Sequence, residues 1–245
     1  MDDLILINNG DSYSFQYIGN LEGFEFPSTR PVIEDISGPQ SSIYITSKFG
    51  RRRLSFQAVL MGDVMAKRRT LLLVGRQGNL KTLKFTTCDN LQLQTDVEIE
   101  KILMPYNMDR RTIVLIEAVA PDWRFYSQAL KSNESTAAEQ TVTNAGNETT
   151  DPVIRINGPF TSATITNLTT GESFVITHTV TAGHYIEIDT KNRTVKYDGD
   201  TSVFTSLAGE FISMVPSANV FRFVRTGGGV GTSLRITWRD AFLGI

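Results

Sequence analysis

Apolar and polar residues alternate with a period of two along several stretches of the chain, which predicts β-strands. Residues 91–99 show the pattern most clearly, and residues 54–60 repeat it. Such alternation buries one face of a sheet and leaves the other in water, as is typical of antiparallel sheets. The phase changes at Lys101, where an apolar residue is expected. This change indicates either a β-bulge or the end of the strand.

One helix is predicted, over residues 62–74. Asp63 is placed to cap its N-terminus, and Gly75 follows as a stop. Two apolar pairs repeat at a spacing of seven residues, Val64 with Leu71 and Met65 with Leu72. We therefore expect Met65, Leu71 and Leu72 to pack into a core.

The second half of the chain has the composition of a β-sheet domain. Residues 126–245 contain 20 threonines, against 8 in residues 1–125, and this β-branched polar residue suits the exposed face of a pleated sheet. Turn residues separate short apolar runs, which favours a sandwich or jelly roll. In the last run Trp238 has the same phase as the apolar residues before it, so we expect it in the core. The predicted strands are 153–156, 163–167, 173–180, 185–189, 194–197, 219–225 and 233–242.

Two domains follow from these patterns. The N-terminal domain is predicted over residues 1–130 and the C-terminal domain over residues 152–245. Residues 131–151 between them are polar, lack aromatic residues and are predicted to be a linker. The fold class is mainly β, with an N-terminal barrel or sandwich that carries one helix and a C-terminal sandwich.

Charge and apolar content exclude several classes of protein. The 24 basic and 26 acidic residues give a net charge of −2, which does not provide the basic surface expected of a nucleic-acid-binding domain. There is no apolar run of membrane-spanning length, and the acidic N-terminus does not resemble a secretory signal. Specific nucleic-acid binding and membrane insertion are not expected.

The residues that usually carry catalysis are scarce. His178, His184 and Cys88 are the only histidines and cysteine, and they are too few and too scattered for a zinc site or a nucleophile–base pair. Asp189 and Asp198 lie in turn sequences, as does Asp200, so turn formation is favoured over a pair of hydrolytic carboxylates. Gly75–Thr82 and Gly227–Gly231 fail the spacing of phosphate-binding loops, and a hairpin tip is the simpler interpretation of the second. We expect no enzyme, no cofactor and no metal.

The triplet Arg51, Arg52 and Arg53 opens a predicted strand. The simplest interpretation is a solvated strand end. The alternative is contact with an acidic partner surface, because arginine is enriched at protein interfaces. These three residues are the candidate interface.

Several segments in a fixed order resemble the distal tail proteins of siphovirus-type bacteriophages. They are, in chain order, KRRTLLLVGRQGNLKTLKFTT, PDWRFYSQ, NETTDPVIRINGP, TNLTTGESFVI, YIEIDTKNRTVKYDG and SLRITWRDAFLGI. The similarity spans most of the chain and is strongest over residues 147–245.

This resemblance implies a structural virion protein located at the tail tip and made in the bacterial host cytoplasm. Proteins of this family form a hexameric ring that joins the tail tube to the tail-tip, tail-associated and receptor-binding proteins. Their N-terminal tail-tube-like domain builds the ring, and their C-terminal domain is a galectin-like sandwich at its periphery. The first half with its helix and the sandwich-like second half agree with that plan.

Two further inferences concern the assembly of a ring and an alternative function. Long antiparallel strands such as residues 91–99 are expected to leave hydrogen-bonding edges that a neighbouring copy can pair, and rings use such heterologous contacts. The alternative function is a lectin-like carbohydrate-binding module, for which Tyr185, Tyr197 and Trp238 are the candidate stacking surfaces.

Overall fold

The structure is a computed structural model that describes residues 4–35, 42–76, 78–105 and 110–244. It divides into two compact units, unit 1 with residues 1–128 and 243–245, and unit 2 with residues 129–242. Both are built almost entirely of strands, so the mainly-β prediction is confirmed. Each unit is described by itself.

The elements of unit 1 form one curved sheet, a helix and a separate hairpin. Their bounds are β1 (Leu4–Asn8), β2 (Asp11–Phe15), β3 (Gly19–Glu22), β4 (Thr29–Asp35), β5 (Ser42–Phe49), β6 (Arg52–Met61), α1 (Val64–Val74), β7 (Lys81–Thr86), β8 (Gln92–Leu103), β9 (Arg111–Ala120) and β10 (Phe125–Ser127). The sheet has the order β2-β1-β7-β8-β9-β6-β3, with β10 paired to β8.

Alternating apolar residues fill the inner face of this sheet. Leu93, Val97 and Ile99 of β8 are at most 5% exposed, as the sequence predicts. The core is rich in phenylalanine, with edge-to-face contacts between Phe15 and Phe56 and between Phe85 and Phe125. Such aromatic pairs add directional stability to area burial.

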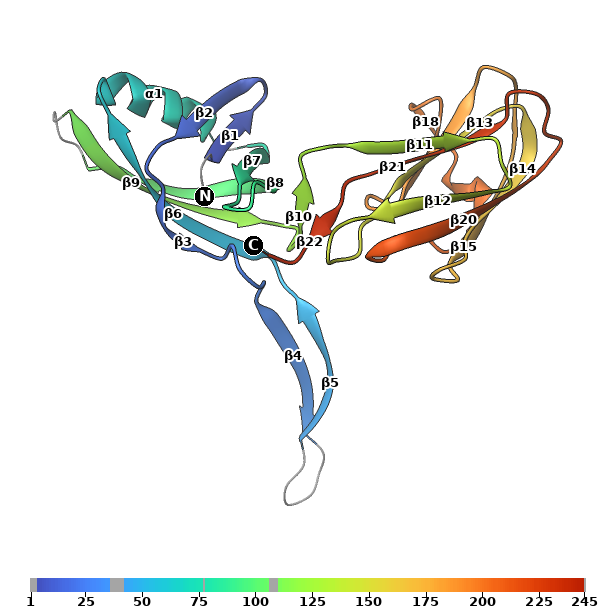
Figure 1. Ribbon diagram of the computed structural model, residues 1–245, viewed down its shortest axis with the longest axis horizontal. Coiled ribbons are helices and arrows are strands. Elements are labelled where there is room, and N and C mark those ends of the chain that lie inside the picture. The colour runs from blue at the N-terminus through green and yellow to red at the C-terminus, as the bar shows by residue number, and fades with distance from the viewer. Residues whose placement is uncertain (1–3, 36–41, 77, 106–109, 245) are drawn as a thin grey trace. The chain divides into compact units, whose positions relative to one another are not determined.

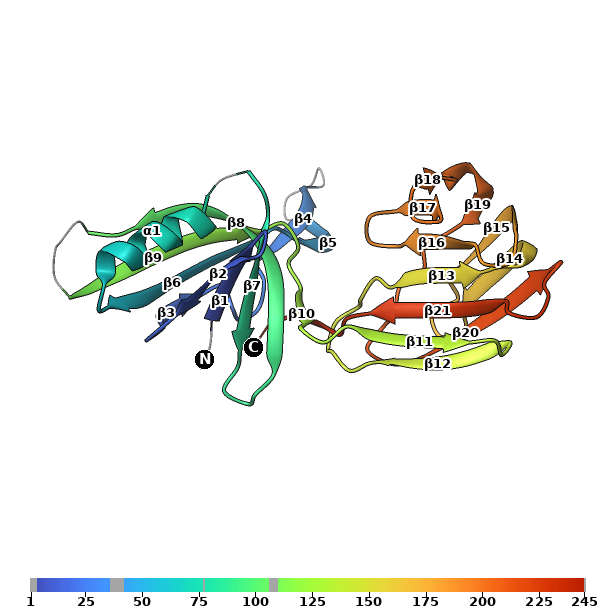
Figure 2. The same cartoon turned by 90° about the horizontal axis from the view of Figure 1, so that it is seen from above.

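Helix α1 packs on β1, β2 and β6 (Figure 2). The Asp63 side chain accepts a hydrogen bond from the Ala66 N–H at 3.0 Å, as an N-cap does. The buried residues of the helix are Val64, Leu71 and Val74. Leu72 is 48% exposed, so its predicted core position is wrong, because the helix buries only the one stripe that faces the sheet.

Strand β8 is longer than the predicted alternation and contains a bulge. The pairing between β8 and β9 shifts between Ile99 and Lys101, and the strand continues to Leu103. The phase change at Lys101 is therefore a bulge. Strand β8 also pairs with β7 on its other side, so the expectation that residues 91–99 leave an open edge is wrong. The sheet path instead ends at β2 and β3.

Strands β4 and β5 form a separate two-stranded sheet. This hairpin extends away from the rest of unit 1 (Figure 1). It pairs with no other strand among the described residues.

Unit 2 is a sandwich of two antiparallel sheets. The six-stranded sheet has the order β11-β21-β13-β16-β17-β18 (Figure 2), and the five-stranded sheet the order β12-β20-β14-β15-β19. The strands of these two sheets are β11 (Lys131–Ser135), β12 (Glu139–Asn144), β13 (Val153–Asn157), β14 (Phe160–Asn167), β15 (Ser173–Val180), β16 (Tyr185–Asp189), β17 (Thr194–Tyr197), β18 (Thr201–Ser202), β19 (Leu207–Gly209), β20 (Ser217–Thr226) and β21 (Ser233–Trp238). A short 3₁₀ helix η1 (Phe204–Ser206) and the short strand β22 (Ala241–Phe242) lie outside both sheets.

The core of unit 2 lies between the two sheets. Leu234, Ile236 and Trp238 of β21 face it, and the Trp238 indole N–H donates a hydrogen bond to the Thr143 carbonyl at 3.2 Å. Trp238 is thus a core residue, as predicted. The glycine-rich loop at 227–231 joins β20 of one sheet to β21 of the other, so its predicted place at a hairpin tip is wrong.

The predicted linker over residues 131–151 is also wrong, because it contains β11 and β12. These strands pair with β21 and β20. In β12 the buried positions are Gln140, Val142 and Asn144, so two of its three inward side chains are polar. Gln140 donates to the Leu234 carbonyl and Asn144 to the Glu148 carbonyl. Buried amides that find partners replace the apolar alternation by which a strand is normally recognised.

Candidate assembly surfaces

The carboxylates considered for catalysis lie at the end of a strand (Asp189) or in a turn (Asp198) and have local hydrogen-bond partners. Asp198 accepts hydrogen bonds from the His184 ring at 2.5 Å and from the Tyr185 N–H at 3.0 Å. These bonds, the one from His184 first, hold the pKa of Asp198 below its usual value. Asp189 accepts from the backbone and side chain of Asn192. Each carboxylate stabilises its own turn.

The residues considered for nucleophilic and metal chemistry are placed as follows. Cys88 is exposed in the turn after β7. Within the described part of the chain, no group of three or more His, Cys, Asp or Glu side chains is placed to hold a metal ion. In that part, too, no helix has the length and apolar character needed to cross a membrane.

The structure separates the three arginines of the candidate interface. Arg52 is 2% exposed. Its guanidinium donates to the carbonyls of Trp123 at 2.8 Å, Gly23 at 3.0 Å and Glu25 at 2.9 Å, and also to that of Leu243. Burial lowers its pKa to about 10, against the opposing effect of the nearby Asp122 and Glu25 carboxylates. Arg52 therefore joins three backbone segments of unit 1, at residues 23–25, 123 and 243, and does not offer its charge to a partner.

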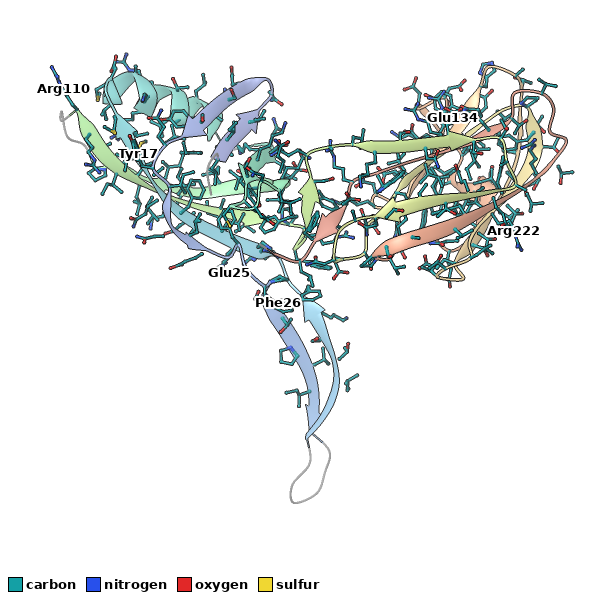
Figure 3. The ribbon with its side chains drawn as sticks, viewed as in Figure 1. Tyr17, Glu25, Phe26, Arg110, Glu134 and Arg222 are labelled. Carbon is teal, nitrogen blue, oxygen red and sulfur yellow. The ribbon has the colours of Figure 1, made fainter. Side chains whose placement is uncertain are left out.

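Arg51 and Arg53 are exposed on either side of Arg52. Together with Arg30 and Phe26 they line a hollow of about 480 Å³ where the hairpin meets the sheet. Phe26 is 63% exposed, and Figure 3 shows it at the root of the hairpin. An exposed aromatic ring among arginines is typical of protein interfaces.

The hairpin itself carries apolar side chains in water. Val32, Ile33 and Ile45 are 37%, 55% and 50% exposed. A two-stranded hairpin in water is marginally stable without a face to pack on. This element is absent from the sequence-based predictions, although its β-branched residues on both sides of the central SGPQSS segment are a recognisable hairpin signature.

The outward face of the main sheet carries a second apolar group, which we call the outer patch and define as Val59, Met61, Leu103, Ile113 and Leu115. Val59 pairs with Ile113, and Leu115 pairs with Leu103. Ile113, Leu103 and Met61 are 54%, 44% and 38% exposed. The sequence signature of this patch is the run TIVLIEAVA in β9, which is apolar in both phases of the alternation. Such a run indicates a strand that is to be covered on both faces.

The aromatic residues considered for carbohydrate stacking are already engaged. The Arg155 guanidinium lies 3.5 Å from the centre of the Tyr185 ring, both histidine rings flank Tyr197, and Trp238 is 7% exposed. Arg155 also lines a polar hollow of about 430 Å³ in unit 2. A free aromatic platform, which a lectin site ordinarily offers, is not provided by these three residues.

Comparison with known proteins agrees with the predicted resemblance. Residues 145–242 match the family model of the siphovirus-type tail component, C-terminal domain. No curated protein has a significantly similar sequence.

Solved structures share the fold over nearly the whole chain. The SPP1 Dit (gp 19.1) protein, described as a paradigm of the hub adsorption apparatus in phages infecting Gram-positive bacteria, is 15% identical, with a TM-score of 0.71 over 98% of this chain and 99% of that one. A chain of the phage P2 baseplate in its activated conformation with Ca is 11% identical, with a TM-score of 0.54 over 96% and 97%. The same baseplate with Sr gives 0.51 at the same identity and coverage.

Residues 145–242 thus form a siphovirus-type tail component C-terminal domain, the whole chain has the fold of the SPP1 Dit hub protein, and the resemblance to siphovirus-type distal tail proteins is confirmed.

Proposed function

We propose that this chain is a structural virion protein that forms a ring at the end of a phage tail and makes or breaks no covalent bonds. The hairpin β4–β5 is the observation that carries this proposal. It places Val32, Ile33 and Ile45 in water and pairs with no further strand in the described part of the chain. Apolar side chains on a projecting hairpin require cover, and a neighbouring protein subunit supplies it.

A ring of identical copies suits the shape of unit 1. A closed ring uses heterologous contacts, in which one surface of a copy meets a different surface of the next. Unit 1 offers such unlike surfaces in the hairpin, the outer patch and the two sheet ends, β2 and β3. The near-neutral net charge of −2 allows copies to approach without strong repulsion.

The roles of the two units and their partners follow from the confirmed resemblance. In this proposal residues 1–130 build the ring, which has six copies, and the sandwich lies at its periphery. The ring joins the tail tube protein to the tail-tip or tail-associated protein and the receptor-binding proteins. The chain is made in the cytoplasm of the bacterial host and functions in the virion, at the tail tip.

The exposed arginines belong to this proposal as contacts for an acidic partner surface. Arg51 and Arg53, with Phe26 beside them, line the hollow at the root of the hairpin. Arg52 contributes by fixing the backbone beneath them, because its own charge is occupied by four carbonyls.

The test is to shorten the hairpin. Residues 30–48 are replaced by a short Gly-Ser turn, and the molar mass is measured by size-exclusion chromatography with light scattering. The matched control shortens the exposed glycine loop at 227–231 of unit 2. We expect the hairpin variant to be a folded monomer and the control to assemble like the native chain. A native chain that stays monomeric at high concentration contradicts the proposal.

A further inference from the structure

The outer patch has no role within a single copy of the chain. Val59, Met61, Leu103, Ile113 and Leu115 point away from the core of unit 1, and three of them are more than a third exposed. The β-bulge at Glu100 is what brings Leu103 to this face, beside Leu115. A bulge that adds an apolar residue to an exposed apolar face is a designed feature of a strand that is to be covered.

The hairpin is a second apolar surface of the same kind, and the two do not cover each other within one chain. Ile33 of the hairpin is 55% exposed and Ile113 of the outer patch is 54% exposed when one copy is considered alone. A contact between hairpin and outer patch must therefore join two different copies.

The order of charges along the two surfaces is complementary. On β9 the outward positions run Arg111, Ile113, Leu115, Glu117. On β4 the alternate positions 30 and 32 are Arg and Val. If the two strands lie in opposite directions, Val32 meets the apolar residues of β9 and Arg30 meets Glu117.

The basic end of the hairpin is under electrostatic strain. Arg30 and Lys48 lie directly opposite each other across the two strands, and like charges in that relation destabilise a strand pair. On the other surface Glu22, Glu100 and Glu117 line a hollow of about 240 Å³ with Arg53 at its edge. The Lys101 ammonium lies 3.9 Å from the Glu117 carboxylate. Three carboxylates therefore face two cations around this hollow, and its net charge is negative.

We infer that the hairpin β4–β5 of one copy packs on the outer patch of the next copy, with Arg30 and Lys48 directed toward Glu100 and Glu117. This inference rests on the proposed ring, and it names the two surfaces that make the contact. The contact is heterologous, so it repeats from copy to copy and closes a ring when the rotation allows.

Cysteine cross-linking tests the contact directly. In a Cys88→Ser background, Val32→Cys and Ile113→Cys are prepared as separate proteins, mixed and oxidised, because Val32 shares its face of β4 with Arg30. We expect a covalent dimer in the mixture and little in either protein alone. The control replaces Ile113→Cys by Val224→Cys, because Val224 is also 54% exposed but lies in unit 2. Equal cross-linking of Val32→Cys to both partners overturns the inference.

Charge exchange tests the orientation. Arg30→Glu with Lys48→Glu, and Glu100→Lys with Glu117→Lys, are each expected to raise the concentration needed for half-assembly by about tenfold or more. Combining all four changes is expected to restore assembly toward the native value. If the combined variant is as weak as either parent, the assigned orientation is wrong.

The outcomes separate this inference from the proposed function. A ring that forms normally in all charge variants and gives no selective cross-link leaves the structural role standing and removes this contact. A chain that forms no oligomer under any condition removes both.

Discussion

Leu103 and Leu115 lie opposite each other on the outward face of the sheet of unit 1, although a regular strand would direct Leu103 to the core. Ile99 points inward, and four residues later a regular strand points inward again. The extra residue at Glu100 reverses the phase, so that Lys101 and Leu103 face outward and Ile102 faces inward.

Replacing Ile102 and Leu103 in turn by lysine tests this arrangement. Ile102→Lys directs a charged side chain toward the core, where an unpaired polar group costs about 1–3 kcal/mol. The chain contains two tryptophans, and unit 1 holds Trp123, so urea unfolding followed by Trp123 fluorescence in a Trp238→Phe background reports on this unit. Leu103→Lys changes a side chain that faces outward and is expected to change the free energy of unfolding by less than about 0.5 kcal/mol. Equal effects of the two changes contradict the assigned role of the bulge.

Replacing Arg52 is expected to destabilise unit 1 strongly. Arg52→Met keeps an unbranched apolar stem but leaves four partly buried carbonyls without their donor, which should lower the free energy of unfolding by about 3 kcal/mol or more. The neighbouring Arg53→Met removes an exposed charge and should cost less than about 0.5 kcal/mol. Denaturant unfolding of the two variants provides the comparison, and a mild effect of Arg52→Met would show that its bonds are not structural.

Trp238 is expected to affect stability as a core residue. Trp238→Ala leaves a cavity between the sheets of unit 2 and should cost about 3–5 kcal/mol. Trp238→Phe keeps most of the packing and loses the hydrogen bond to the Thr143 carbonyl, at a cost of about 1 kcal/mol from that bond. Thermal unfolding followed by circular dichroism should show that Trp238→Ala is less stable than Trp238→Phe. A stable Trp238→Ala protein contradicts the core assignment.

Asp198 is expected to make an acid-dependent contribution to the stability of unit 2. Its folded-state pKa lies below the usual 3.8, because the charged form accepts hydrogen bonds from His184 and the Tyr185 N–H. This contribution is therefore complete above pH 3.8 and is lost as the pH falls through the folded-state pKa. The melting temperatures of the native chain and Asp198→Asn should differ at pH 7 and converge in acid. A difference in melting temperature that grows as the pH falls contradicts this account.

The sequence predicts the strands of this protein wherever apolar residues alone fill the inward positions. Strand β8 can be predicted because its inward positions include the apolar residues Leu93, Val97 and Ile99. Strand β12 is not recognisable in the sequence because Gln140 and Asn144 take such positions. Both side chains donate hydrogen bonds to carbonyls of chain segments far from them in sequence. Partners of that kind are not visible before the fold is known.

Less of the candidate surfaces than of the strands can be predicted from the sequence, for a related reason. Three adjacent arginines look alike in the sequence, but strand alternation buries Arg52 and exposes Arg51 and Arg53. Leu72 and Leu71 are likewise neighbours with opposite environments, 48% and 0% exposed. The outer patch depends on the bulge at Glu100, whose effect on Leu103 becomes clear only when the register with β9 is known.

The central claim is that this chain exists to assemble with copies of itself and with other tail components. Native mass spectrometry of the purified protein over a range of concentrations tests it most directly. The account predicts a closed species, with six copies by the resemblance to distal tail proteins, that is lost when Val32 and Ile113 are both replaced by Asp. A native chain that remains a single copy at every concentration, together with an unchanged spectrum of the double variant, contradicts it.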